Sequence, residues 1–332
     1  MSLQARKSSH TSQARVGEKA NLSLGLGEER NMRFDHLPRS SQIEDRRGAA
    51  PRGLPRGRVG GIGIGTVLLL TLVGWILGIN PLYLIGGAQM VSGLRDSQQQ
   101  VQPAPSGTEI GQASDQMGQF VSAVLGSTEV QWKEIFSRSG RTYRPPTLVM
   151  FSGATQSACG FAQSAMGPFY CPNDQKVYLD TTFFRDLEQR FQACDGSKSC
   201  QFSQAYVITH EIGHHVQNLL GILPRVQQAQ RGMDQVESNQ LQVRVELQAD
   251  CLAGIWAHYA EEKWQFLEPG DIEAAMQTAS AIGDDRLQRR TQGYAVPDAF
   301  THGSSQQRTS WFMAGLRTGQ LASCDTFQGV RL

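Results

Sequence analysis

The sequence predicts an α+β fold in which a small β-sheet precedes a mainly helical body, with one transmembrane helix before both. Residues 146–153 and 176–184 are short runs of β-branched and aromatic residues, which are typical of strands. From Gln201 almost to residue 290, apolar residues recur at helical spacing. No charged residue occurs between Arg58 and Arg95, which indicates a membrane-spanning segment.

Residues 1–58 are predicted to form a disordered basic arm, because they are largely polar and carry 12 Lys/Arg against 6 Asp/Glu. Met32 begins a stretch that would make a sensible start, so residues 1–31 are a candidate start-site artefact. The whole chain has a formal net charge of only +1, so the rest of it is mildly acidic. A basic arm on an acidic body suits either nucleic acid or a membrane, and the next segment decides between them.

Residues 59–79 are predicted to be the membrane anchor. They form an uncharged run of 21 residues, about 31 Å long as a helix, and the hydrocarbon core of a bilayer is about 30 Å thick. Arginines are dense before the run and absent directly after it, so we expect a cytoplasmic N-terminus and a body outside the cytoplasm. A cleaved signal peptide is the alternative, but the run is longer than a signal core and lies far into the chain. The arginines of the basic arm are therefore explained by the orientation of the anchor in the lipid bilayer, and we expect no nucleic-acid partner.

Residues 80–107 are rich in Gln, Pro and Ser and are predicted to be a linker, which places the globular domain at 108–332. Residues 109–140 open this domain with apolar residues at helical spacing. All 6 cysteines follow the anchor, as expected for disulfides in an oxidising compartment. Among the fifteen possible pairings we favour Cys194–Cys200, Cys159–Cys171 and, by elimination, Cys251–Cys324. Free buried thiols are the alternative.

The most informative stretch is VITHEIGHHVQ, residues 207–217, which lies in a predicted helix. Residues four apart share a helix face, so His210 and His214 lie about 40° apart and can bind one Zn²⁺ through ring nitrogens. His215 lies about 140° from His210 and cannot join them. Glu211 comes near the open side of such a metal, where a carboxylate can take a proton from a water molecule. The alternative is a helix with two unrelated histidines.

A catalytic zinc site needs a third protein ligand, and the next predicted helix, residues 239–264, offers one. It carries Glu246 and Asp250 among apolar residues, where a buried carboxylate must be paired or must bind a metal. The two share a face, so Glu246 can bind zinc while Asp250 accepts a hydrogen bond from a zinc histidine. Glu237 is the rival ligand, but its neighbours are polar and no aspartate follows it at the matching spacing. A solvated helix face with a salt bridge is the alternative for Glu246 and Asp250.

Three stretches carry a family resemblance: QAYVITHEIGHHVQN, VRVELQADCLAGIWA and GDDRLQ…FTHGSSQQRTSWFMAGL…CDTF. They are similar to the predicted neutral zinc metallopeptidases of bacteria, and the similarity runs from about residue 32 to the C-terminus. The resemblance implies a zincin-like fold, a Zn²⁺ cofactor held by His210, His214 and Glu246, and Glu211 as the catalytic base. It also implies one N-terminal membrane anchor. Together with the arginines before residues 59–79, this predicts a single-pass inner-membrane protein with an extracytoplasmic, periplasmic catalytic domain. Residues 1–31 and the Cys194–Cys200 segment depart from the usual pattern.

Peptide hydrolysis also needs a donor for the developing oxyanion, and His302 is the best candidate because it lies in a Gly/Ser loop. Tyr294 is a rival. His215 is expected to support the site or the fold without binding the metal, and His258 to pack on the helix of Glu246. The acidic stretch 283–285 is expected to cap a helix.

The leading hypothesis is a membrane-anchored zinc metallopeptidase that hydrolyses protein or peptide substrates with a zinc-activated water molecule and Glu211 as general base. The alternative is a non-catalytic, zinc-stabilised envelope scaffold or assembly factor. Glu211 argues against the alternative, because a structural zinc site needs no base and usually closes its fourth position with Cys or His. The sequence determines neither the natural substrate nor the oligomeric state.

Overall fold

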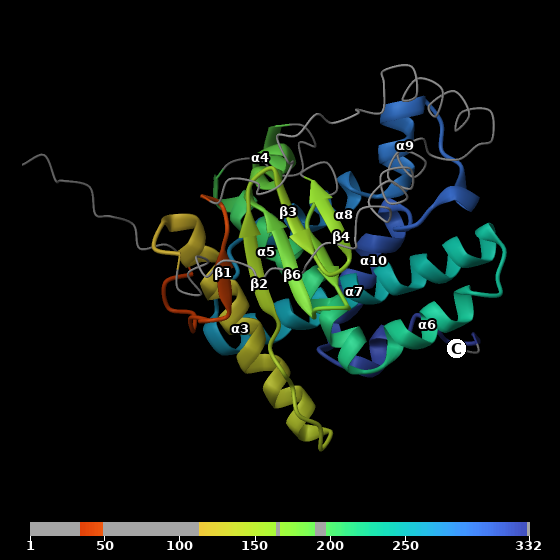
Figure 1. Cartoon of the computed structure of the whole chain (residues 1–332). Helices are drawn as coiled ribbons and strands as arrows, with labels where there is room; N and C mark the ends of the chain where they lie inside the picture. The colour runs from red at the N-terminus through yellow and green to blue at the C-terminus, as the bar shows by residue number, and fades with distance from the viewer. Residues whose placement is uncertain (1–33, 49–112, 164–166, 190–196, 331–332) are drawn as a thin grey trace, which may run out of the picture. The chain divides into compact units, whose positions relative to one another are not determined.

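Four strands form a mixed sheet beside a helical body in the computed structural model of the chain, which describes residues 34–48, 113–163, 167–189 and 197–330 (Figure 1). The strand order is β1 (Ile43–Asp45), β2 (Thr147–Phe151), β6 (Lys176–Asp180) and β5 (Phe169–Cys171). β1, β2 and β6 run parallel, whereas β5 is antiparallel to β6 and forms an edge of the sheet. A separate hairpin pairs β3 (Ala154–Ser157) with β4 (Gly160–Gln163).

The two predicted strand runs form β2 and β6, whose side chains are buried on both faces of the sheet. Leu148 and Met150 of β2 belong to the main core. Val149 packs with Tyr178 of β6 in a smaller cluster. The second run is a strand only as far as Asp180, whose carboxylate accepts a hydrogen bond from the backbone of Thr182 and so caps the next helix. That helix is α4 (Thr181–Gln189).

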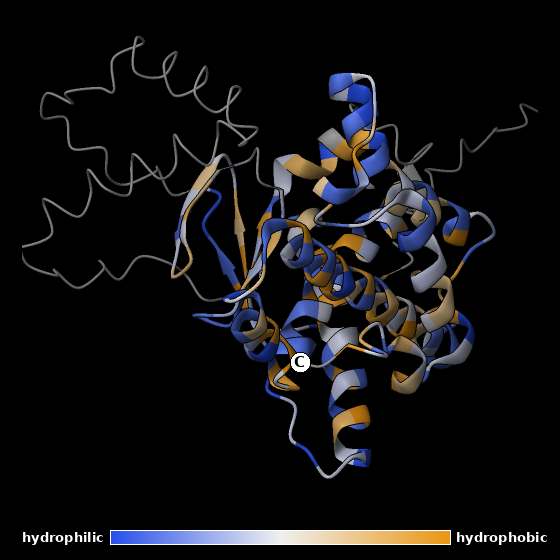
Figure 2. Cartoon of the chain, turned by 90° about the vertical axis from the view of Figure 1, so that its right-hand side faces the viewer, coloured by the Kyte–Doolittle hydropathy of each residue, from blue (hydrophilic) through white to orange (hydrophobic). Residues whose placement is uncertain are grey.

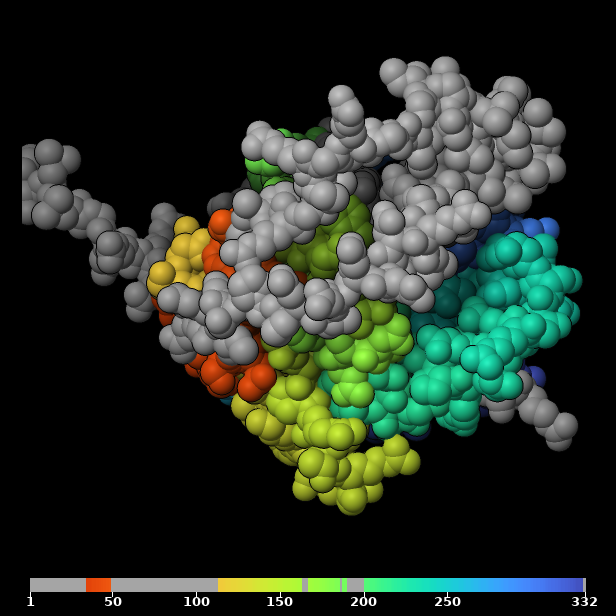
Figure 3. Space-filling model, in the orientation of Figure 1, coloured from red at the N-terminus to blue at the C-terminus, as the bar shows by residue number. Residues whose placement is uncertain are grey.

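The helical body is centred on two long helices, α5 (Ser197–Leu219) and α7 (Gln235–Trp264), so the predicted helical character after Gln201 is confirmed. Figure 2 shows the apolar residues gathered toward the middle of this body. In Figure 3, α6 and the adjoining part of α7 form the surface beside the strands. The other helices in the described part of the chain are α3 (Gln116–Arg138), α6 (Ile222–Gln230), α8 (Asp271–Ala281), α9 (Asp284–Gln292), α10 (Ser305–Thr318) and the 3₁₀ helices η2 (Pro297–Ala299) and η3 (Leu321–Cys324).

Glycines allow the helices that carry the site to approach closely. A Cβ atom at Gly213 of α5 would lie 3.0 Å from the carbonyl oxygen of Ala249 in α7. A Cβ atom at Gly315 of α10 would lie only 1.9 Å from the carbonyl oxygen of Cys251, so α10 can pack on α7 only without a side chain there. These contacts determine how closely α5 and α10 pack against α7.

The prediction that residues 1–58 form a disordered arm is wrong for residues 34–48. β1 pairs with β2, and Arg47 bridges Asp45 at 2.6 Å and Asp115, the N-cap residue of α3, at 2.7 Å. The prediction rested on the net charge of the arm, which does not reveal that Arg47 is paired with two carboxylates. It also overlooked the few apolar side chains that enter the core, which are Phe34, Leu37 and Ile43. The folded body therefore includes residues 34–48 as well as the predicted domain.

This pairing also bears on the membrane prediction. Hydrogen-bonded neighbours in one sheet lie on one side of a membrane, so residues 34–48 cannot be cytoplasmic while the body lies outside. The predicted anchor 59–79, the linker 80–107 and residues 1–31 lie outside the described residues. Within the described part of the chain, no helix is long and apolar enough to span a bilayer.

Two of the predicted disulfides are confirmed. Cys159–Cys171 ties the β3–β4 hairpin to the edge strand β5, and Cys251–Cys324 ties η3 to α7. Cys200 is also disulfide-bonded, and its predicted partner, Cys194, lies outside the described residues.

Candidate metal centre

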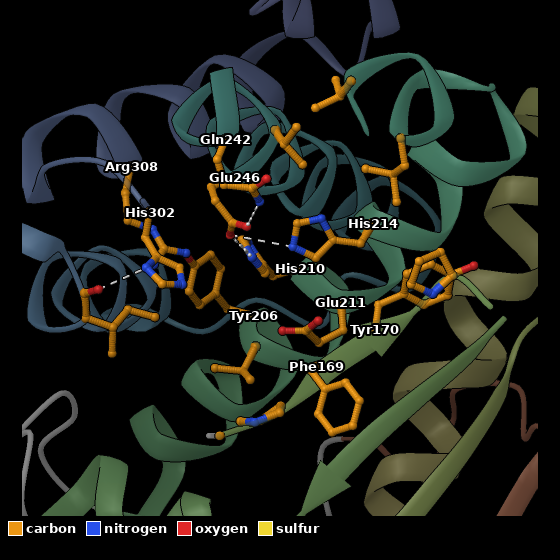
Figure 4. Close-up of a pocket in the computed structure, with 18 of the residues that line it drawn as sticks. Phe169, Tyr170, Tyr206, His210, Glu211, His214, Gln242, Glu246, His302 and Arg308 are labelled. Atoms are coloured by element: carbon orange, nitrogen blue, oxygen red, sulfur yellow. Dashed lines mark hydrogen bonds and ion pairs between the residues drawn. The ribbon is translucent and has the colours of Figure 1, made fainter. Parts of the chain in front are cut away.

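Three predicted ligands from two helices meet at one point. His210 and His214 project from α5, and Glu246 projects from α7 (Figure 4). Oε2 of Glu246 lies 3.2 Å from Nε2 of His210 and 3.5 Å from Nε2 of His214. Ligand atoms of the three residues all lie within 4.8 Å of one another, so they could hold a metal ion together.

The ligand set fits zinc in chemistry and in spacing. Zinc bonds of about 2.0–2.1 Å in a tetrahedron place neighbouring ligand atoms about 3.3 Å apart, which the two measured separations approach. Both histidines also donate from Nδ1 to another residue, which leaves each Nε2 free as a ligand. Two imidazoles and a carboxylate are the donor set of many catalytic zinc sites.

Asp250 holds His210 in this orientation, as the sequence predicts. Its Oδ1 accepts a hydrogen bond from Nδ1 of His210 at 2.8 Å, and the side chain is fully buried. Burial alone raises the pKa of Asp250, but the charges of Arg308 and His210 outweigh it and lower that pKa to about 2. The carboxylate is therefore ionised at neutral pH and accepts from His210.

Gln217 plays the same part for His214, and sequence reasoning missed it. Its Oε1 accepts from Nδ1 of His214 at 2.9 Å, and its Nε2 donates to the carbonyl of Val245 at 2.8 Å. Gln217 is fully buried. Its position three residues after His214 on one helix was a usable signal, since such residues are neighbours on the helix surface.

The third ligand candidate is Glu246, and its rival lies elsewhere. Nε2 of Gln242 donates to Oε1 of Glu246 at 3.0 Å. Burial raises the pKa of Glu246, but when both rings are protonated, which a bound metal prevents, the charge of His214 and hydrogen bonds from both histidines outweigh burial and hold that pKa well below its usual range. Glu237 instead forms the capping box of α7 with Asp234 and does not belong to the cluster.

Glu211 lies beside the ligand cluster and lines the same pocket of about 590 Å³ (Figure 4). Its side chain is largely buried, yet among the described residues it has no hydrogen-bond or ion-pair partner. A carboxylate in this position is available to a substrate or a water molecule in the pocket. Much of the pocket wall is apolar and includes Phe169, Phe183, Val207, Leu223, Ile282 and Leu287.

His302 lines the same pocket, and Asp284 at the start of α9 holds it. Oδ1 of Asp284 accepts from Nδ1 of His302 at 3.3 Å, which leaves Nε2 of that ring unused. Oδ2 of Asp284 accepts from the backbone of Thr301, His302 and Gly303. The acidic stretch therefore lies at the start of a helix, but the predicted capping is not found, because Gly283 is the N-cap residue and no side chain caps the helix. Asp284 instead fixes a loop that the sequence did not connect to it. Tyr294, the rival donor, is 62% exposed and does not line the pocket.

Comparison with known proteins agrees with this geometry. The family model described as "Putative neutral zinc metallopeptidase" matches residues 32–327. The chain belongs to this family. It is 45% identical to the "Uncharacterized protein YpfJ" of Escherichia coli strain K12 over 304 residues, which cover 89% of this chain and 99% of the relative. It is 43% identical to the "Uncharacterized protein Rv2575" of Mycobacterium tuberculosis strain H37Rv over 221 residues, 64% of this chain and 71% of the relative. No solved structure matches the chain.

In this member of the metallopeptidase family, the histidine next to the ligand pair supports the fold of the pocket. His215 donates from Nε2 to the carbonyl of Arg144 at 2.7 Å and accepts at Nδ1 from the hydroxyl of Tyr170 at 3.1 Å. Asn218 donates to the same hydroxyl at 2.9 Å. Because Tyr170 belongs to β5, these bonds tie the pocket-lining edge strand to α5. His258 packs between α7 and α10, where it donates to the carbonyl of Leu316 at 2.8 Å.

Proposed function

We propose that the protein is a zinc-dependent peptidase in which His210, His214 and Glu246 hold the ion. The observation that carries this proposal is the three-residue cluster with the carboxylate of Glu211 beside it in a pocket, where no other described residue pairs with that carboxylate. Bound zinc would supply Lewis-acid polarisation of a peptide carbonyl and would lower the pKa of a water molecule. The substrate class that this chemistry serves is a protein or peptide.

The chain's own residues would transfer the proton, stabilise the oxyanion and orient the ligands. Glu211 takes the proton of the attacking water and returns it to the amine that leaves when the peptide bond breaks. His302, protonated on both ring nitrogens, donates from Nε2 to the oxyanion that develops on the carbonyl, while Asp284 accepts from Nδ1 and keeps that ring oriented. Asp250 and Gln217 keep the two histidine rings aimed at the ion.

The pocket supports catalysis over a scaffold role. A structural zinc site closes all its coordination positions with protein ligands. The cluster has three ligands among the described residues, and it opens onto a pocket of about 590 Å³. Neither the pocket nor the position of Glu211 would serve a site that only stabilises the fold.

The test replaces Glu211 by Gln, which keeps the size of the side chain and removes the base. We expect Glu211→Gln to retain zinc and to hydrolyse an unfolded protein substrate at least about 100-fold more slowly than the wild-type chain. Glu237→Gln is the matched control, because Glu237 lies in the capping box of α7 outside the pocket, and it should retain activity. Full activity of Glu211→Gln would exclude the assigned base, and a wild-type chain that binds zinc without hydrolysing any substrate would favour the scaffold.

We further propose that the folded body lies outside the cytoplasm and is attached to the lipid bilayer through residues 59–79. The disulfides support an oxidising compartment, and the uncharged run supports the attachment. Because residues 34–48 belong to the folded body, the proposal puts them on the same side of the membrane as residues 113–330. Residues 59–79 would then enter and leave the bilayer on that side, and the predicted single crossing is not part of this proposal. Single cysteines at Arg39 and Gln320, labelled with an impermeant thiol reagent in intact cells, should both react. Labelling at Gln320 alone would contradict the proposed arrangement.

A further inference from the structure

Arg308 is a buried cation in α10 that faces the residue behind His210. Its side chain is only 3% exposed. Nε donates to Oδ2 of Asp250 at 2.9 Å, and Nη2 donates to Oδ1 of Asp250 at 2.9 Å. Nη2 also lies 3.2 Å from the hydroxyl oxygen of Tyr206. The guanidinium therefore engages both oxygens of a carboxylate that is itself fully buried.

The two parallel bonds determine the plane of the Asp250 carboxylate. A planar guanidinium that donates from two nitrogens fixes both the position and the rotation of its partner, which a single charge cannot do. The hydroxyl of Tyr206 donates to Oδ1 of Asp250 at 2.6 Å and adds a third bond. With the carboxylate held in this way, Oδ1 stays 2.8 Å from Nδ1 of His210.

The helix that carries Arg308 is itself held firmly. Its N-terminus has a complete capping box between Ser304 and Gln307. Its middle lies against α7 at Gly254 and Gly315, where neither helix has room for a side chain. Arg308 is thus presented from a rigid element, so its guanidinium is in place before any metal binds.

We propose that Arg308 is a positioning residue of the metal centre, which acts through Asp250 to keep Nε2 of His210 directed at the ion. The inference rests on the proposed zinc site and adds a residue from a third helix to it. Arg308 binds neither metal nor substrate in this role. Its effect is on how well the ligand set is organised for zinc.

The test measures zinc affinity of the purified full-length chain by competition with a chromogenic chelator. We expect Arg308→Met to weaken zinc binding roughly 10–100-fold, because loss of a partner behind a ligand typically has that effect. Arg308→Lys keeps the charge without the two parallel bonds, so its zinc affinity should lie between that of the wild type and that of Arg308→Met. Arg47→Met is the matched control, because it removes an arginine that bridges two carboxylates far from the cluster, and its zinc affinity should equal that of the wild type.

A double-mutant cycle with Asp250→Asn separates positioning from general destabilisation. If Arg308 acts through Asp250, the chain with both substitutions binds zinc no more weakly than Asp250→Asn alone. Losses that multiply in the double variant, or a wild-type affinity in Arg308→Met, would overturn the inference. If Arg308→Met does not fold, Arg308→Lys decides: a several-fold loss supports the role and wild-type affinity refutes it. A wild-type chain without zinc affinity would instead refute the proposed function itself.

Discussion

Gln217 links the two helices that carry the metal ligands. It accepts from His214 of α5 and donates to the backbone of Val245 in α7. Nε2 of Gln217 also donates to Oε1 of Gln248. We expect Gln217→Met to leave Nδ1 of His214 and Oε1 of Gln248 without this partner, to lower the free energy of unfolding by about 1–3 kcal/mol and to weaken zinc binding by roughly tenfold or more. Denaturant unfolding and chelator competition measure the two effects.

The control for this prediction is Gln217→Glu. A glutamate keeps an acceptor for Nδ1 of His214 but loses the donor to Val245, so zinc affinity should be recovered in part while stability is not. Identical zinc affinities in the Met variant and the wild type would show that His214 needs no partner.

The free energy of unfolding should depend on pH through His215, because its pKa differs between the folded and the unfolded chain. Burial lowers its pKa to about 4, although the hydrogen bond to the carbonyl of Arg144 opposes the shift. In the unfolded chain its pKa is about 6.5, so the unfolded state takes up the proton first as pH falls. The stability that neutral His215 confers is therefore complete above about pH 6.5 and is lost between about 6.5 and 4, by up to about 3 kcal/mol.

The variant His215→Gln tests this dependence, since glutamine does not titrate. We expect the free energy of unfolding to fall less between pH 7 and pH 4.5 in His215→Gln than in the wild type. Urea unfolding at the two pH values gives the difference, and every other titrating group cancels in the comparison. Equal pH dependence in the two chains would mean that His215 is not held neutral.

At the scale of elements, the short strand β1 is held in place by burial of one of its side chains and by pairing with β2. Ile43 is fully buried and pairs with Leu148 of β2. We expect Ile43→Ala to lower the free energy of unfolding by about 2–5 kcal/mol, as for other large core side chains. Zinc affinity should not change, because β2 and β6 separate β1 from β5 and the pocket.

The exposed neighbour Gln42 provides the control for this strand. Gln42→Ala should alter stability by no more than about 0.5 kcal/mol, because its side chain is exposed and its hydrogen bond to β2 comes from the backbone carbonyl. Thermal and denaturant unfolding of both variants make the comparison. If Ile43→Ala were as harmless as Gln42→Ala, residues 34–48 would not belong to the folded body.

At the scale of the whole molecule, zinc should stabilise the fold by joining α5 to α7. An ion present at 100 times its dissociation constant adds about 2.7 kcal/mol to the free energy of unfolding. We therefore expect a chelator to lower the melting temperature by roughly 5–10 °C without unfolding the chain, because the main core lies around and beyond the ligand cluster. Calorimetry with and without zinc measures the shift.

Substitutions of two glutamates on α7 test whether the shift in melting temperature comes from zinc bound at this cluster. Glu246→Ala should abolish the shift that zinc produces, whereas Glu237→Ala, on the same helix and outside the cluster, should retain it. A melting temperature that does not respond to zinc in the wild-type chain would contradict a metal bridge between the two helices.

Much of the metal centre was predictable because its relations are local. The spacing of His210 and His214 fixes their shared face on any helix, and the same rule relates Glu246 to Asp250. Both pairs needed only a helix assignment, which the apolar periodicity supported. The two confirmed disulfides were among the favoured pairings, although the number and placement of the cysteines left fifteen pairings open.

The partners of these residues were not predictable, because they come from distant parts of the chain. Arg308 meets Asp250 across 58 residues, and Asp284 holds His302 across 18. A basic residue on a helix or an acidic turn has many possible partners in a sequence, and only packing selects one. The role of residues 34–48 was missed for a related reason: their charge suggested disorder, and their pairing with β2 is non-local.

The sequence by itself determined the shared helix faces of His210 with His214 and of Glu246 with Asp250, the carboxylate of Glu211 beside the first pair, and the helical body, since each follows from spacing along one helix. Only the tertiary structure decided which helices meet, what holds each histidine ring and which strand completes the sheet. The physical reason is that periodicity describes the geometry of one element. The approach of two elements depends on side-chain volume and on the burial of polar groups that must find partners.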